Sequence, residues 1–182
     1  MALPIVVFGA TGKQGGSVVK YLLQEPKYQV IGVTRNTESE SAKALSQQGV
    51  KLVKADFTDK DSLQRAVQGA HGVFLVVDPD FFADDLYESE FGRVQLFADI
   101  LLKAGVEKVV YTCWSKYGVT DPKKCGTLDS KTDGFLHLKA AGVPVAGVVM
   151  MSYHENIFDP THTRKVKDGV HEFSKWNSYA YL

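Results

Sequence analysis

Residues 5–16 read IVVFGATGKQGG, a short apolar run followed at once by a glycine-rich loop. Glycines 9, 12 and 15 give this loop a G-x-x-G-x-x-G spacing. Glycine suits it because one position must turn sharply, one must let backbone approach a pyrophosphate, and one must let the next helix pack on the strand. That helix then offers free N–H groups and a positive dipole end to an anion. The stretch predicts a dinucleotide-binding loop, against the alternative of a glycine-rich turn without a ligand. The candidate residues are Gly9, Ala10, Thr11, Gly12, Lys13, Gln14 and Gly15.

The rest of the chain alternates short apolar runs with helical patterns. Several runs are nearly continuous, as in parallel strands that are buried on both faces. Strand–helix alternation of this kind predicts a doubly wound, Rossmann-type α/β fold, with a parallel sheet flanked by helices. The predicted strands cover residues 5–8, 28–33, 51–54, 73–77, 108–111 and 145–150, and the helices cover 13–24, 84–104 and 129–141. Two further helices begin near Thr37 and Thr58, and Gly49, Gly69, Gly105 and Gly142 are predicted to end helices in a left-handed conformation.

Composition excludes several classes of function. The chain has 182 residues with 21 Lys+Arg and 21 Asp+Glu, so its zero net charge gives no electrostatic footprint for nucleic acid or an anionic membrane. The longest apolar stretch, 143–151, contains a proline and is too short to cross a bilayer. Two cysteines and five histidines show no metal-ligand spacing, so no metal site is expected. We expect a cytoplasmic protein, with nuclear entry left open.

The end of the second predicted strand distinguishes between the two nicotinamide cofactors. An acidic residue there would hold the ribose hydroxyls of NAD, but this chain has Arg35. A guanidinium suits a 2′-phosphate through a charge-assisted contact, which favours NADP(H); the alternative is a solvated surface arginine. After the third strand, Asp56 and Phe57 either flank an adenine ring or are an acidic helix-entry residue and a core aromatic.

At these residues the sequence resembles the NmrA-like group of atypical short-chain dehydrogenases. The resemblance covers about residues 3–158 and rests on VVFGATGKQGGSV at 6–18, VTRN at 33–36, KVVYT at 108–112, and GVP at 142–144 followed by YHENI at 153–157. It implies a dinucleotide-binding domain over residues 1–158 and a short tail, 159–182, packed on the same domain. In that family a later lysine and a Y-x-E-N segment line the NADP site. These positions add Lys131, Tyr153, His154, Glu155 and Asn156 to the candidates.

Two departures from the family pattern concern catalysis. Catalytic members of the wider superfamily use Tyr-x-x-x-Lys, in which the lysine lowers the pKa of the tyrosine so that it can shuttle a proton. Here Thr127 stands four residues before Lys131, and none of the eight tyrosines has a lysine four residues later. Only 26 residues follow Asn156, so we expect the family's smaller substrate domain to be abbreviated or absent.

Three hypotheses about function follow. The first is an NADP(H)-binding redox sensor or regulatory protein with little or no turnover, as in sensor-type family members. The second is an NADPH-dependent reductase of a small carbonyl or quinone that uses Lys131 as its catalytic residue. The third is a relative that retains only the fold.

Several weaker signals leave their alternatives open. A regulatory protein partner and a homodimer both remain open, and the aromatic tail (Phe173, Trp176, Tyr179 and Tyr181) either docks on its own domain or forms a partner surface. Cys113 is expected to be buried and inert rather than a redox-reactive thiol. The acidic segment 78–90 is interpreted as a solvated loop and helix start.

Overall fold

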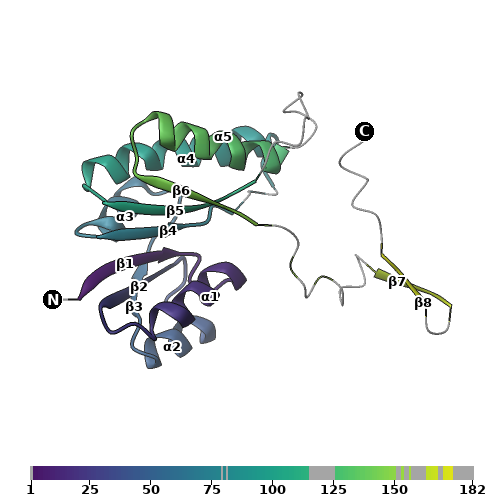
Figure 1. Ribbon diagram of the computed structural model, residues 1–182, viewed down its shortest axis with the longest axis horizontal. Coiled ribbons are helices and arrows are strands. Elements are labelled where there is room, and N and C mark those ends of the chain that lie inside the picture. Colours follow the sequence, from purple (N-terminus) through teal and green to yellow (C-terminus); the bar gives the residue numbers. More distant parts are fainter. Residues whose placement is uncertain are drawn as a thin grey trace.

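The computed structural model describes residues 2–78, 80, 82–114, 126–150, 153 and 156, and the backbone of 163–167 and 170–173; at 126 and 127 it also describes the backbone alone. Figure 1 shows the elements along the chain. They are β1 (Leu3–Phe8), α1 (Lys13–Leu22), β2 (Tyr28–Thr34), α2 (Glu40–Gln47), β3 (Lys51–Lys54), α3 (Lys60–Val67), β4 (Gly72–Leu75), α4 (Leu86–Lys103), β5 (Lys108–Cys113), α5 (Gly126–Ala140), β6 (Val145–Val149), β7 (Thr163–Lys167) and β8 (Val170–Phe173).

Six strands form one sheet in the order β3-β2-β1-β4-β5-β6, with every neighbouring pair parallel. The chain runs outward from β1 to β3 and then crosses to β4 on the other side of β1. Val7 of β1 therefore pairs with Gly32 of β2 on one side and with Phe74 of β4 on the other. This reversal opens a crevice at the carboxyl ends of β1 and β4, where doubly wound sheets bind their ligands. The predicted fold class is confirmed.

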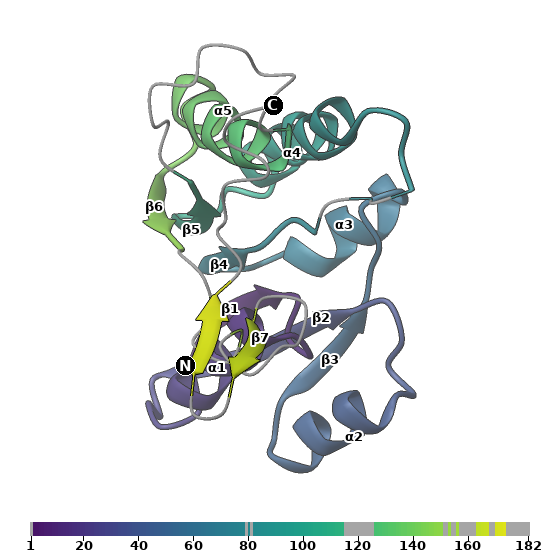
Figure 2. The ribbon, with the colours of Figure 1, turned by 90° about the vertical axis from the view of Figure 1, so that its right-hand side faces the viewer.

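Both faces of the sheet carry an apolar core, which explains the continuous apolar run of β1. Val6 and Phe8 face one core, in which residues of α3, α4 and α5 are buried. Val7 faces the other, together with Val19 of α1 and partly buried Leu45 of α2. Figures 1 and 2 show α4 and α5 lying side by side along the half of the sheet formed by β4, β5 and β6. A strand buried on both sides cannot alternate apolar with polar residues.

The four glycines predicted to end helices do so with positive φ, at +91° for Gly49, +72° for Gly69, +66° for Gly105 and +87° for Gly142. The predicted helix starts near residues 37 and 58 are displaced. The N-caps are Ser39, which accepts a hydrogen bond from the Ala42 N–H, and Asp59, which accepts one from the Ser62 N–H. Ser39 lies two residues after Thr37 and Asp59 one residue after Thr58, and each takes the cap because serine and aspartate are N-cap acceptors at least as good as threonine.

Strands β7 and β8 pair antiparallel as a separate two-stranded sheet (Figure 1). The prediction that residues 159–182 pack on the domain depends largely on Trp176, Tyr179 and Tyr181, which lie outside the described residues. The division at residue 158 and the docking of the tail therefore stay predictions.

The largest aromatic cluster of the core lies just behind the carboxyl ends of β1 and β3. Phe97 of α4 is fully buried, and its ring centre lies 4.9 Å from that of Phe8 and 5.9 Å from that of Phe57. We predict that Phe97→Ala lowers the free energy of unfolding by about 3–5 kcal/mol, because it removes an aromatic ring and leaves a cavity.

The matched control for that prediction is Phe82→Ala, since the side chain of Phe82 is 99 % exposed. It should change the free energy of unfolding by no more than about 0.5 kcal/mol. Urea denaturation measures both values. Equal midpoints for the two variants would contradict the packing described for Phe97.

Candidate functional site

A cavity of about 760 Å³ opens at the carboxyl ends of β1, β2, β3 and β4. Its size suits a small-molecule or cofactor site. The structure brings together most of the residues predicted from the sequence, although Ala10 is buried behind the loop and Asn156 does not line the cavity. His154 and Glu155 lie outside the described residues. The predicted residues that line the cavity are Gly9, Thr11, Gly12, Lys13, Gln14, Gly15, Arg35, Asp56, Phe57, Lys131 and Tyr153.

The glycine loop forms the floor of the cavity and is closed tightly on itself. Gly9 has a φ of +64°, and the Gly12 N–H donates to its carbonyl oxygen at 2.9 Å. A Cβ placed on Gly15 would lie 2.2 Å from that same oxygen, far inside van der Waals contact. No side chain fits between the first turn of α1 and the end of β1. The third glycine of the motif therefore sets how closely the helix approaches the strand.

Helix α1 points its amino terminus into the cavity. Its N-cap is Gly12, for which the described residues supply no side-chain cap, and its first turn carries no acidic side chain. By contrast, α2, α3 and α4 are capped by Ser39, Asp59 and Asp85. The first N–H groups of a helix have no partner within it, and the helix dipole makes this end attractive to anions. The arrangement suits a phosphate group of a ligand.

Arg35 extends from the end of β2 at the opposite rim of the cavity from Lys131. Its side chain is exposed, and the neighbouring polar residues Asn36, Ser39 and Ser41 line the same part of the cavity. A guanidinium with nearby hydroxyl groups can hold a phosphate through charge-assisted hydrogen bonds.

Asp56 and Phe57 serve the structure as well as the cavity. The Asp56 carboxylate accepts hydrogen bonds from the N–H and the hydroxyl of Thr58, at 2.8 and 2.7 Å. These bonds lower the pKa of Asp56 below its usual value, and Arg35 and Arg93 add smaller contributions. The Phe57 ring packs 5.5 Å from that of Phe8. The core-aromatic interpretation of Phe57 therefore holds, while both residues also line the cavity.

Lys131 reaches from α5 to the segment just after β4 and to α4. Its ammonium donates to the Val77 carbonyl oxygen at 2.8 Å and forms an ion pair with the carboxylate of Glu90. The Glu90 side chain is 0 % exposed, and its second oxygen accepts a hydrogen bond from the Ser130 hydroxyl at 2.7 Å. The charge of Lys131 is therefore matched by a buried carboxylate, and the lysine links three elements at the edge of the cavity.

Two residues of this region, Glu90 and Arg93, were not among those predicted from the sequence. The interpretation of 78–90 as a solvated segment was wrong for Glu90, which lies on the buried stripe of α4 with Val94, Phe97 and Leu101. A carboxylate on an apolar helical stripe is the signal that could have revealed a buried partner. Arg93, which lines the cavity, carried no comparable signal.

Arg93 fixes the segment that follows β4. Its guanidinium donates to the Asp78 carbonyl oxygen at 2.9 Å and pairs with the Asp80 carboxylate at 3.0 Å. Asp80 also accepts a hydrogen bond from the Phe82 N–H at 3.2 Å, which supports the turn that follows. The wall of the cavity beside β4 is therefore held by a half-buried ion pair.

Tyr153 brings the segment after β6 onto the glycine loop. Its hydroxyl accepts a hydrogen bond from Gln14 Nε2 at 2.7 Å, and the Lys13 ammonium lies 4.9 Å from its ring centre, within cation–π distance. The other amide atom, Gln14 Oε1, is buried without a partner among the described residues. A buried polar atom beside the loop is a position where a ligand donor would be favourable.

Cys113 at the end of β5 is buried, and burial raises the pKa of its thiol. The thiolate is the reactive form, so this environment favours the inert residue over a reactive one. Within the described ranges, no group of histidine, cysteine or acidic side chains is arranged for a metal ion. None of the helices in these ranges is long and apolar enough to cross a membrane.

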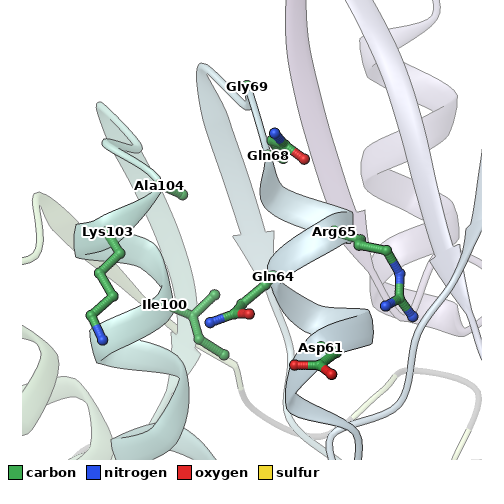
Figure 3. A pocket seen from close by; sticks show the side chains of 8 residues that line it. All are labelled: Asp61, Gln64, Arg65, Gln68, Gly69, Ile100, Lys103 and Ala104. Carbon is green, nitrogen blue, oxygen red and sulfur yellow. The ribbon is translucent and has the colours of Figure 1, made fainter.

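A second cavity, of about 540 Å³, lies between α3 and α4 and holds none of the predicted residues. Figure 3 shows Gln64 of α3 and Ile100 of α4 facing each other there. Gly69 and Ala104, at the carboxyl ends of the two helices, also line it. Because the carboxyl end of a helix repels anions, this cavity is the poorer candidate for a phosphate-containing ligand.

The model of the NmrA-like family matches residues 2–176. The chain belongs to the NmrA-like family. It is 35% identical over 113 residues to an NmrA-like family domain-containing protein of Dictyostelium discoideum, covering 62% of this chain and 36% of that protein. It is 39% identical over 111 residues to an NmrA-like family domain-containing oxidoreductase of Penicillium ochrochloron, covering 59% and 33%. The chain spans about a third of the length of these relatives.

Solved structures agree on the fold. Citrobacter sp. triphenylmethane reductase complexed with NADP(H) matches with a TM-score of 0.69 and 25% identity over 83% of this chain and 50% of that one. An NADPH-dependent quinone oxidoreductase from Escherichia coli, complexed with NADPH, matches with a TM-score of 0.70 and 25% identity over 86% and 52%. The negative transcriptional regulator NmrA in complex with NADP has a TM-score of 0.67 and 19% identity over 81% and 45%, and this likeness concerns the fold alone.

The glycine loop of this NmrA-like chain offers a matched pair of substitutions. We predict that Gly15→Ala lowers both thermal stability and dinucleotide affinity, because its Cβ would overlap the Gly9 carbonyl group at 2.2–2.5 Å. Gly16→Ala should be neutral or stabilising by up to about 1 kcal/mol, because its Cβ would stand at an ordinary 3.4 Å from the nearest atom and alanine favours the helix. Thermal melting and calorimetric titration test the pair. A Gly15→Ala variant that matches Gly16→Ala in both would disprove the close approach.

Proposed function

We propose that the chain binds NADP(H) in the cavity at the carboxyl ends of its strands and acts as a redox sensor or regulatory protein with little or no turnover. One observation carries the proposal. The uncapped amino terminus of α1 and the guanidinium of Arg35 line the same cavity, so two separate anion-binding features are offered to a single ligand. NADP(H) carries a pyrophosphate and a separate 2′-phosphate, which correspond to these two features.

The residues present suit this ligand from end to end. The first N–H groups of α1 would hold the pyrophosphate, Arg35 with the hydroxyl of Ser41 would hold the 2′-phosphate, and Phe57 would lie beside the adenine. The nicotinamide end would then face Lys131 and Tyr153. Two features of the loop support the fit of NADP(H) to this cavity. No side chain has room at Gly15, and the buried Gln14 Oε1 has no partner among the described residues. The complexes of the triphenylmethane reductase and the quinone oxidoreductase support the choice of cofactor.

The surroundings of Lys131 support low turnover. When bound, the reduced nicotinamide supplies a hydride, but reduction of a carbonyl also needs a proton donor beside the reacting oxygen. Two of the three N–H donors of Lys131 already bond to the Val77 carbonyl oxygen and to Glu90. The residue four positions before Lys131 is a threonine rather than a tyrosine. An aliphatic hydroxyl cannot replace a phenol as a general acid near neutral pH. The chain is better equipped to hold the nucleotide than to turn it over.

A second candidate function is an NADPH-dependent reductase of a small carbonyl or quinone that uses Lys131. Two structural neighbours at 25% identity, a triphenylmethane reductase and an NADPH-dependent quinone oxidoreductase, favour it. So does the position of the Lys131 ammonium, which lines the cavity. A third hypothesis, a relative that keeps only the fold, predicts no nucleotide binding. A protein partner, a homodimer and a cytoplasmic location also remain predictions.

Arg35 should determine the preference for NADP(H) over NAD(H). We predict that Arg35→Ala weakens NADPH binding by about 1–3 kcal/mol, or roughly 5- to 150-fold, because a charged hydrogen bond to the 2′-phosphate is lost. NADH binding should change little. The control is Arg65→Ala, which removes an exposed arginine that lines the cavity between α3 and α4 instead (Figure 3). Calorimetric titration with NADPH and NADH measures both affinities. Equal affinities of the parent protein for the two cofactors would refute the role of Arg35 in binding the 2′-phosphate.

Turnover separates the sensor from the reductase. We predict that aldehydes, ketones and quinones consume NADPH at rates well below about 1 s⁻¹, since the factor of about 10²–10⁴ from general acid catalysis is missing. The assay follows NADPH absorbance with the parent and with the Glu90→Gln/Lys131→Met double variant, which avoids leaving a buried carboxylate without its cation. Turnover in the ordinary enzyme range that disappears in the double variant would favour the reductase.

A further inference from the structure

We propose that Glu90 is a positioning residue for Lys131. Its buried carboxylate fixes the lysine ammonium at the edge of the cavity, so that one N–H donor is left for the ribose on the nicotinamide side of NADP(H). This inference rests on the proposed binding of NADP(H) and assigns a role to a residue of α4 that does not line the cavity itself.

Burial and charge give Glu90 little freedom. Its side chain is 0 % exposed on the apolar stripe of α4, where an ionised carboxylate is costly unless it is paired and hydrogen-bonded. Both oxygens have partners, since one faces the Lys131 ammonium and the other accepts from the Ser130 hydroxyl at 2.7 Å. Ser130 is itself fully buried. Two consecutive residues of α5 are thus held against one carboxylate of α4.

Two acceptors, the Val77 carbonyl oxygen and the Glu90 carboxylate, determine where the Lys131 ammonium lies. A lysine ammonium has three donors on a flexible four-carbon stem. One donor goes to the Val77 carbonyl oxygen at 2.8 Å and one to Glu90. No acceptor among the described residues takes the third, and the Lys131 side chain is 19 % exposed and lines the cavity. Because the Lys131 side chain is already held in place on folding, little further conformational entropy is lost when its third N–H donor binds the ligand, and this favours binding.

A positioning role and a purely structural role predict different ligand responses. Adenosine 2′,5′-bisphosphate carries the adenine and the 2′-phosphate of NADP(H) but lacks the nicotinamide ribose. It should occupy the end of the cavity near Arg35 and leave the Lys131 end empty. Loss of the fold would weaken the bisphosphate and NADPH alike, whereas a misplaced Lys131 would weaken NADPH alone.

The decisive variant is Glu90→Gln, which has nearly the same shape, retains acceptor and donor atoms for Lys131 and Ser130, and removes the charge. We expect it to weaken NADPH roughly 2- to 10-fold, the range of one hydrogen bond, and to change adenosine 2′,5′-bisphosphate binding less than about twofold. Glu88→Gln removes a charge from an exposed residue of the same helix and should leave both affinities unchanged. Calorimetric titration of the parent and both variants with NADPH and with adenosine 2′,5′-bisphosphate measures these affinities.

A double-mutant cycle with Lys131→Met tests whether Glu90 acts through the lysine. If it does, Glu90→Gln should cause no further loss of NADPH affinity once Lys131 is methionine. Lys131→Met alone leaves the buried carboxylate without its cation and is expected to melt at a lower temperature, whereas the double variant should recover much of that loss. If the single lysine variant does not fold, Glu90→Gln with the two ligands still decides the question.

The outcomes separate the two proposals. A parent that binds both ligands, with a Glu90→Gln variant that keeps full NADPH affinity or loses both ligands equally, would overturn the positioning role alone. Additive losses in the cycle would also overturn it. A parent that binds neither ligand would contradict the proposed NADP(H) function itself, and with it this role for Glu90.

Discussion

The contact between glycine 15 and the Gly9 carbonyl group is the constraint on which the site depends. Helix α1 starts so close to the end of β1 that a single methyl group would lie 2.2 Å from the carbonyl oxygen. This closeness places the amino terminus of the helix on the floor of the crevice formed where β1 separates β2 from β4. Phosphate recognition by this loop is therefore a property of the backbone, and the surrounding side chains complete it rather than create it.

The second physical theme is the distribution of charge around the cavity. The whole chain is neutral, yet the side chains that line the cavity include four cations, Lys13, Arg35, Arg93 and Lys131, against two carboxylates, Asp56 and Asp78. Arg93 and Lys131 are paired with Asp80 and Glu90, so they keep their positions when the cavity has no ligand. Lys13 and Arg35 are the exposed cations among the four. The pairs leave no large excess of positive charge, so the cavity suits phosphate groups through the positions of its cations and of the amino terminus of α1 rather than through net charge.

The sequence predicted those features that local rules determine. The glycine spacing, the continuous apolar strands and the glycines that end helices depend on a few neighbouring residues, and the structure agrees with each of them. The placement of Glu90 and Arg93 depends on which helices face each other, so spacing along the chain could not reveal their partners. Asp56 was predictable only in part. Its position at the cavity followed from the sequence, whereas the hydrogen bonds that its carboxylate accepts from Thr58 did not.

The central claim is that a nucleotide binds where the glycine loop meets the end of β2. Amide hydrogen exchange of the intact chain, with and without NADPH, tests this location most directly, since a bound ligand slows the opening of the amides that it contacts. A nucleotide bound there should slow exchange in peptides that contain residues 9–16 and 33–41 and leave exchange between α3 and α4 unchanged. Unchanged exchange at the loop, or protection confined to the cavity between α3 and α4, would contradict it.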